Sequence, residues 1–93
     1  MLRNKSYDFA LNIVELYKHL TSNKREFVLS KQLIRSGTSI GADIRKAEFA
    51  HSSKDFIHKM SIVLKEINET DYWLSILNDS NYITIKLIDI LYK

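Results

Sequence analysis

The side chains that could carry chemistry in this sequence are histidines, acidic residues and serines. Glu48 and His51 form a Glu-x-x-His pair, and Glu66 and Glu69 stand three residues apart. Di-iron sites in helical bundles need two Glu-x-x-His pairs and further glutamates from other helices. The sequence holds only one such pair. We therefore expect no metal site and no cofactor, and the paired carboxylates are more typical of a solvated or salt-bridged surface.

Nucleophilic catalysis also lacks its usual residues. The chain has no cysteine, serines occur beside expected helix starts where capping explains them, and no glycine-rich loop precedes a helix to hold a phosphate. An enzymatic function would rest only on the four acidic and histidine residues named above. We therefore predict that the protein is not an enzyme and has no catalytic residues.

The absence of cysteine also fits a reducing cytoplasm. No apolar run approaches the ~20 residues that span a bilayer. The N-terminal segment carries acidic residues within its apolar stretch and has no small-residue cleavage site, so it does not read as a signal peptide. We expect a cytoplasmic protein without a membrane partner.

A cluster of cations gives the clearest indication of a binding function. The cluster consists of Lys24, Lys31, Arg35, Arg45 and Lys46. On a helical wheel these five residues fall within about 100° of one another. No acidic residue shares that arc. Such a face could follow a phosphate backbone. Only Phe27 offers an aromatic ring near it, so the pattern favours backbone contact over base reading. The alternative is a solvated helix exterior.

The elements that would position these residues are all helical. The chain has no proline and two glycines, which favours long helices and few turns. Apolar periodicity predicts helices over about 5–20, 24–50, 53–78 and 85–92. Asn23 with Glu26, and Ser52 with Asp55, are the expected start signals of the second and third helices. We predict one domain over 1–93, an all-α antiparallel up-and-down four-helix bundle with a short fourth helix.

Two helices have distinctive apolar patterns. The third carries a heptad stripe, which we expect to be buried, of Phe56, Met60, Val63, Ile67, Thr70, Leu74 and Leu77. The second is interrupted by small residues, including Gly37 and Gly41. Each glycine costs a helix about 1 kcal/mol relative to alanine. We expect close approach of a neighbouring helix as the compensation, with a kink as the alternative.

More apolar surface is present than a monomeric bundle needs. The surplus side chains lie outside the main stripes of the first and third helices: Tyr7, Leu11, Val14, Ile62, Tyr72, Trp73 and Ile76. Surplus apolar faces usually mark an interface, and small cores often need an oligomer to complete them. We therefore predict a homo-oligomer with these residues at its interface. The alternative is a four-helix core that wraps widely enough to bury them.

Two segments resemble a known family. Residues 35–44 (RSGTSIGADI) contain a Ser-Ile-x-Ala motif, and residues 55–74 (DFIHKMSIVLKEINETDYWL) contain Lys-Glu-x-x-Glu-Thr-x-Tyr-Trp-Leu. Together, and in this order, they are similar to the bacterial four-helix-bundle family named for proteins encoded in 23S ribosomal RNA intervening sequences. The likeness extends from Tyr7 to Ile83.

The resemblance implies an antiparallel four-helix bundle without established enzymatic activity. It also implies kinship with the accessory protein of diversity-generating retroelements, a basic homopentamer that associates with nucleic acid and a reverse transcriptase. The family usually has asparagine at the position of Asp43 and often glutamate at that of Lys46. Its fourth helix normally continues past the position of Lys93, so we expect either a truncated copy or a core completed by partners.

These observations lead to two functional hypotheses besides the weak enzymatic one. The first is an oligomeric accessory protein that binds nucleic acid, structured RNA above all, through the basic face of the second helix. The second is a protein-interaction or assembly module with no direct role in nucleic-acid binding. The cognate nucleic acid, the protein partner and the copy number of the assembly are left open by the sequence.

Overall fold

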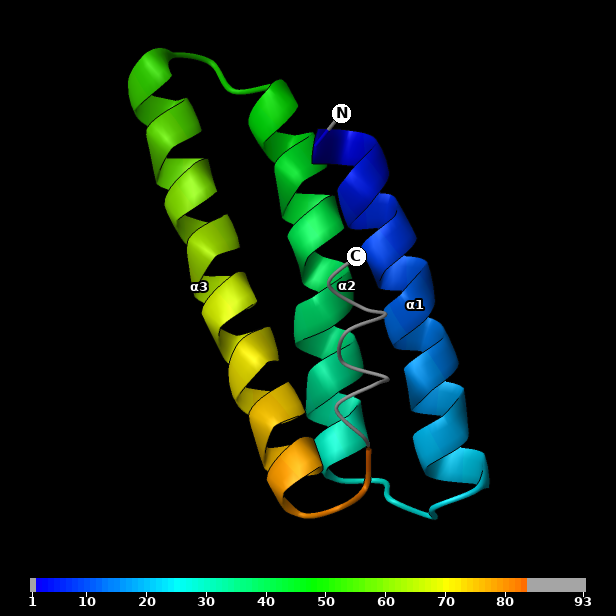
Figure 1. Cartoon of the computed structure of the whole chain (residues 1–93). Helices are drawn as coiled ribbons and strands as arrows, with labels where there is room; N and C mark the ends of the chain where they lie inside the picture. Colours follow the sequence, from blue (N-terminus) through cyan, green and yellow to red (C-terminus); the bar gives the residue numbers. More distant parts are fainter. Residues whose placement is uncertain (1, 84–93) are drawn as a thin grey trace.

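Three antiparallel helices form the part of the protein that the structure describes. A computed structural model describes residues 2–83, with α1 spanning Leu2–Ser22, α2 spanning Leu29–Glu48 and α3 spanning Ser53–Asp79. The chain runs down α1, up α2 and down α3 (Figure 1). Residues 2–83 contain no strand, so the predicted all-α class is confirmed. The short fourth helix predicted over 85–92 lies outside the described residues.

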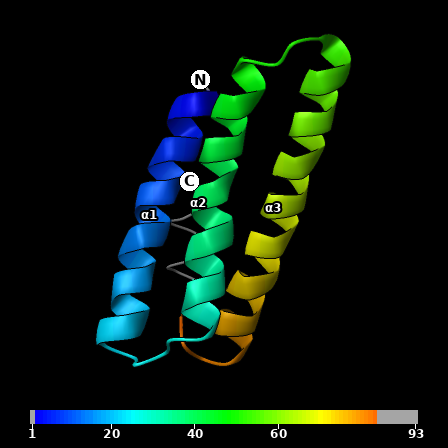
Figure 2. The ribbon, with the colours of Figure 1, turned by 180° about the vertical axis from the view of Figure 1, so that it is seen from behind.

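The three helices lie side by side in one layer, and α2 is the central one (Figures 1 and 2). It packs against both α1 and α3, which lie on either side of it in both views (Figures 1 and 2). One buried cluster ties the three helices together near the α1–α2 connection: Ile13, Leu16, Leu20, Leu33, Leu74, Leu77 and Ile83. A second cluster of Ile40, Ile44 and Val63 joins α2 to α3, and Phe9 packs against both clusters. Burial of these side chains supplies the main driving force for folding.

An apolar groove of about 320 Å³ runs between α1 and α3, lined by side chains of all three helices. Ile67 belongs to the predicted buried stripe of α3 but lines this groove and is 43% exposed. Its place on the stripe does not bury it fully, because α1 and α3 make little direct contact among the described residues. Val63, Thr70, Leu74 and Leu77 of the same stripe are buried as predicted, whereas Phe56 near its N-terminal end is also exposed.

The predicted start of α2 is wrong. We expected a helix from residue 24, capped by Asn23 and Glu26, but α1 continues to Ser22 and α2 begins only at Leu29. The Glu26 carboxylate caps α2 instead. It accepts hydrogen bonds from the backbone N–H groups of Val28 (3.0 Å), Leu29 (2.8 Å) and Ser30 (2.7 Å). These are the donors that a helix start leaves without intrahelical partners.

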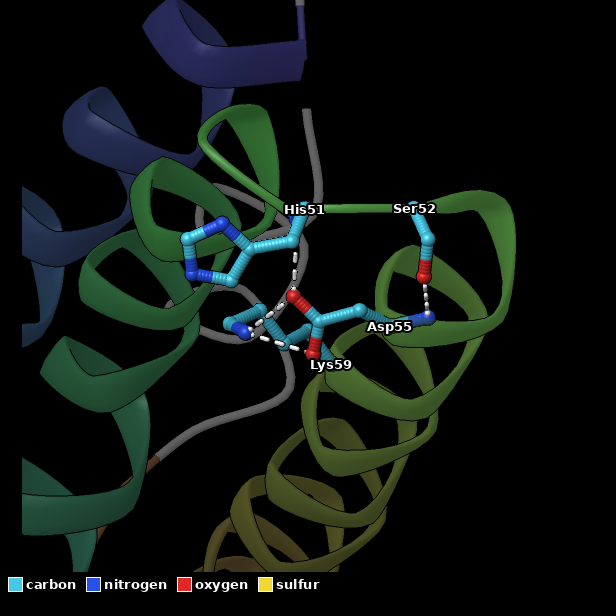
Figure 3. A network of polar contacts seen from close by, with 4 residues as sticks. All are labelled: His51, Ser52, Asp55 and Lys59. Carbon is cyan, nitrogen blue, oxygen red and sulfur yellow. Dashed lines mark hydrogen bonds and ion pairs between the residues drawn. The ribbon is translucent and has the colours of Figure 1, made fainter.

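The predicted start of α3 is confirmed. The Ser52 hydroxyl accepts a hydrogen bond from the backbone N–H of Asp55 at 3.1 Å (Figure 3). The Asp55 carboxylate accepts from the backbone N–H of His51 at 3.0 Å and from Lys59 Nζ at 2.7 Å. The hydrogen bond from Lys59, followed by the one from His51, lowers the pKa of Asp55. Its carboxylate also lies at the positive end of the helix dipole.

Close approach of α1 and α2 explains Gly37, one of the small residues of α2. A Cβ atom built on Gly37 would lie 2.9 Å from both Cγ atoms of Ile13. The expected close contact is therefore confirmed at this position, where the glycine lets the two helices approach. A Cβ atom built on Gly41 would meet Ser6 Oγ at 3.4 Å, which is close to ordinary van der Waals contact.

Candidate nucleic-acid interface

The basic face of α2 lies on the outside of the three-helix layer. Lys31, Arg35, Arg45 and Lys46 are all exposed, whereas Leu33, Ile40 and Ile44 on the opposite side of α2 are buried in the core. Lys31 and Lys46 lie about 22 Å apart along the helix axis. We call these four cations the α2 basic face.

Lys24, the fifth predicted member, is not on α2. It lies in the connection between Ser22 and Leu29, where its side chain is exposed. The helical wheel that placed it on the basic arc assumed a helix from residue 24, and that assumption fails because Glu26 starts α2 later. Lys24 therefore stands near the beginning of the α2 basic face as a loop cation, and the helix itself does not fix its direction.

The two cations at the C-terminal end of the face have different partners. Lys46 Nζ lies 3.7 Å from Asp43 Oδ1, with 72% of the lysine side chain exposed. Ion pairs this exposed contribute little to stability. Arg45 lies over the ring of Tyr7 on α1, with Cζ 5.6 Å from the ring centroid. Sequence reasoning missed this contact, because no sequence pattern indicates which residue of α1 meets which residue of α2.

Negative charge borders the face on the side of α3. A polar pocket of about 290 Å³ lies between α2 and α3, lined by Gln32, Arg35, Ser36, Ser39, Glu66 and Glu69. Partial burial raises the pKa of Glu66, and the negative charges of Glu69 and Asp43 raise it further. These acids partly compensate the charge of Arg35. The strongest positive potential is therefore expected away from α3, toward Lys31 and α1.

The residues considered for a metal or catalytic site do not come together as a set of ligands. Glu48 pairs with Arg3 of α1 at 3.8 Å between Oε2 and Nη1, whereas the backbone of His51 belongs to the start of α3. Glu66 and Glu69 share the polar pocket with Arg35. Among the described residues, no three histidine or acidic side chains are grouped so that they could hold a metal ion.

The predicted interface residues separate into exposed and half-buried groups. Tyr7, Leu11, Ile62 and Tyr72 are exposed, and Val14, Trp73 and Ile76 are half-buried. Trp73 packs against the main core cluster and makes an edge-to-face contact with Tyr72 at 5.1 Å between ring centroids. Three residues of this set lie on α1 and four on α3, and α2 lies between these two helices (Figure 1).

The described helices define a small all-α protein with a basic face on its central helix. Within residues 2–83, none of the helices combines the length and the apolar character of a membrane span. Residues 2–93 match the family described as 23S rRNA-intervening sequence protein, and the chain belongs to this family.

A solved relative supports this assignment. The chain is similar to a crystal structure from Bacteroides thetaiotaomicron, described as a protein of unknown function from the S23 ribosomal protein family. The two share 53% identity and a TM-score of 0.95, and the match covers 98% of this chain and 84% of the relative. No curated protein matches this chain.

Proposed function

We propose that this member of the 23S rRNA-intervening sequence family is a cytoplasmic, non-enzymatic accessory protein. In this proposal it works as an oligomeric four-helix bundle and binds nucleic acid, structured RNA above all, through the α2 basic face. The supporting observation is that four exposed cations follow the outer side of one rigid helix for about 22 Å. Cations along such a face can contact phosphates of a nucleic-acid backbone, which provides affinity without base specificity.

The proposal predicts that two neutralising substitutions on this face weaken RNA binding. Relative to the parent, Lys31→Gln/Arg35→Gln should bind a structured RNA about tenfold more weakly at low salt, because two phosphate contacts are lost. The slope of log affinity against log salt should also become shallower by about 1.5, since each lost contact removes about 0.7–0.9. A fluorescence titration at low and near-physiological salt measures both quantities.

The matched control is Lys54→Gln/Lys65→Gln, which removes the same net charge from exposed positions on α3. This control should keep most of the affinity and the parental salt slope. Equal losses in the two double variants would indicate a diffuse effect of net charge and would contradict a defined face. Absence of binding by the parent at low salt would remove the nucleic-acid function altogether.

A second candidate function is an assembly module, favoured by the exposed apolar side chains. Tyr72 on α3 is 59% exposed and Ile62 is 38% exposed, although water contact at such residues is unfavourable. If they form the interface of a homo-oligomer, Tyr72→Ala should shift the protein toward smaller species in sedimentation velocity, while thermal unfolding of the monomer changes little. Tyr72 is a better test than Trp73, because Trp73 packs against the core. An unchanged sedimentation profile would exclude Tyr72 from the interface.

A further inference from the structure

Tyr7 adds an aromatic surface to one end of the α2 basic face. Its ring, on α1, lies under the guanidinium of Arg45 at 5.6 Å from the ring centroid to Cζ. This separation is within the range of a cation–π interaction. Tyr7 is nevertheless 52% exposed, so a large part of this residue faces solvent although its ring contacts Arg45.

The type of partner matters for the charge that Arg45 presents. A carboxylate partner, such as the one that Asp43 provides to Lys46, neutralises a cation. An aromatic ring restrains the guanidinium without cancelling its charge. Arg45 is therefore positioned by Tyr7 and still carries a full positive charge that a phosphate can accept.

A restrained cation next to an exposed aromatic ring is the combination with which proteins bind unpaired nucleotides. The cation contacts the phosphate, and the base stacks on the ring or on the guanidinium plane. Leu11, one helical turn further along α1, is also exposed and extends the apolar surface beside Tyr7. Neither side chain is explained by the core, since both lie on the outside of α1.

We propose that Tyr7, held beside Arg45, forms a stacking platform for an unpaired nucleobase at the C-terminal end of the α2 basic face. This inference rests on the proposed nucleic-acid function and specifies its ligand as RNA in which an unpaired nucleotide adjoins a helix. The rest of the α2 basic face contacts the phosphates of the base-paired RNA, and the platform holds the unpaired base. The protein therefore binds a bulged or looped RNA more tightly than a continuous duplex of the same length.

The test compares a bulged RNA and a fully paired RNA, with 2-aminopurine at the unpaired position to report stacking. Tyr7→Leu keeps apolar bulk and removes the ring, and Tyr7→Phe keeps the ring. We expect Tyr7→Leu to weaken binding of the bulged RNA about tenfold, to leave binding of the paired RNA and the salt slope unchanged, and to abolish the 2-aminopurine signal. Tyr7→Phe should behave as the parent, and Phe49→Ala, which removes a different exposed ring, should also have no effect.

Two results would overturn the platform while leaving the α2 basic face intact. One is a parent that binds both RNAs equally, with a loss of affinity only in Lys31→Gln/Arg35→Gln. The other is a Tyr7→Leu variant that loses both RNAs together and sediments as a smaller species, which would make Tyr7 an assembly residue. If the parent binds neither RNA, the platform and the proposed nucleic-acid function are both wrong.

Discussion

Replacing Glu26 by alanine is expected to lower the free energy of unfolding by about 2–3 kcal/mol. Glu26 is 8% exposed, and its carboxylate accepts three hydrogen bonds from backbone N–H groups at the start of α2, those of Val28, Leu29 and Ser30. Loss of an ordinary capping side chain costs about 0.5–2 kcal/mol, and hydrogen bonds to a charged group are stronger than neutral ones. Chemical denaturation at neutral pH measures the difference.

The same residue should make stability depend on pH. Burial alone would raise the pKa of Glu26, but the hydrogen bonds from Leu29, Ser30 and Val28 outweigh it and hold the pKa below its ordinary value of 4.5. An acid with a lowered folded-state pKa stabilises the protein fully above its unfolded-state pKa, and this stabilisation is lost as the pH falls through the folded-state pKa. The parent should therefore lose stability below about pH 4.5, and Glu26→Gln should lose less over that range.

A substitution at the other helix start provides a comparison for the size of the Glu26 effect. The Asp55 carboxylate also accepts backbone and lysine hydrogen bonds, but it lies near the surface at the start of α3. Asp55→Asn should therefore cost less than Glu26→Gln at neutral pH. If both Glu26 variants unfold at the parental denaturant concentration, the carboxylate does not hold the start of α2.

The two helix starts show which local features a sequence can reveal. Ser52 and Asp55 follow the usual spacing of a helix cap, and the structure places both as predicted. Glu26 also stands three residues after a candidate cap, so the same rule proposed a start at Asn23. The rule fails there because one side chain reaches three donors of a later turn, and Arg25 adopts a left-handed φ of 51° that redirects the chain. The later start of α2 depends on tertiary packing, as the burial of Glu26 indicates.

The candidate site was predictable to a similar extent. Residues on one helix share a face by periodicity alone, so the positions of Lys31, Arg35, Arg45 and Lys46 on the exposed side of α2 follow from the sequence. Contacts between helices depend on their relative register, which periodicity does not contain. For this reason the ring of Tyr7 under Arg45 and the acids beside Arg35 became visible only in the structure.

The two glycines of α2 should respond in opposite directions to the same substitution. Gly41→Ala is expected to raise the free energy of unfolding by up to about 1 kcal/mol, because alanine favours the helix and the added methyl group meets Ser6 no closer than 3.4 Å. Gly37→Ala gains the same helical preference, but its methyl group would lie 2.9 Å from two atoms of Ile13. Ile13 has no exposed surface into which it could move.

Overpacking of this kind costs about 1–3 kcal/mol, so Gly37→Ala should be less stable than the parent by up to about 2 kcal/mol after the helical gain of about 1 kcal/mol. A double-mutant cycle with Ile13→Ala identifies the cause. Ile13→Ala alone leaves a cavity and costs about 2–5 kcal/mol, but in the Gly37→Ala background it also relieves the clash and should cost less. Additive losses, or a stabilising Gly37→Ala, would mean that α1 and α2 can separate at this crossing, and the small residues of α2 would then need another explanation.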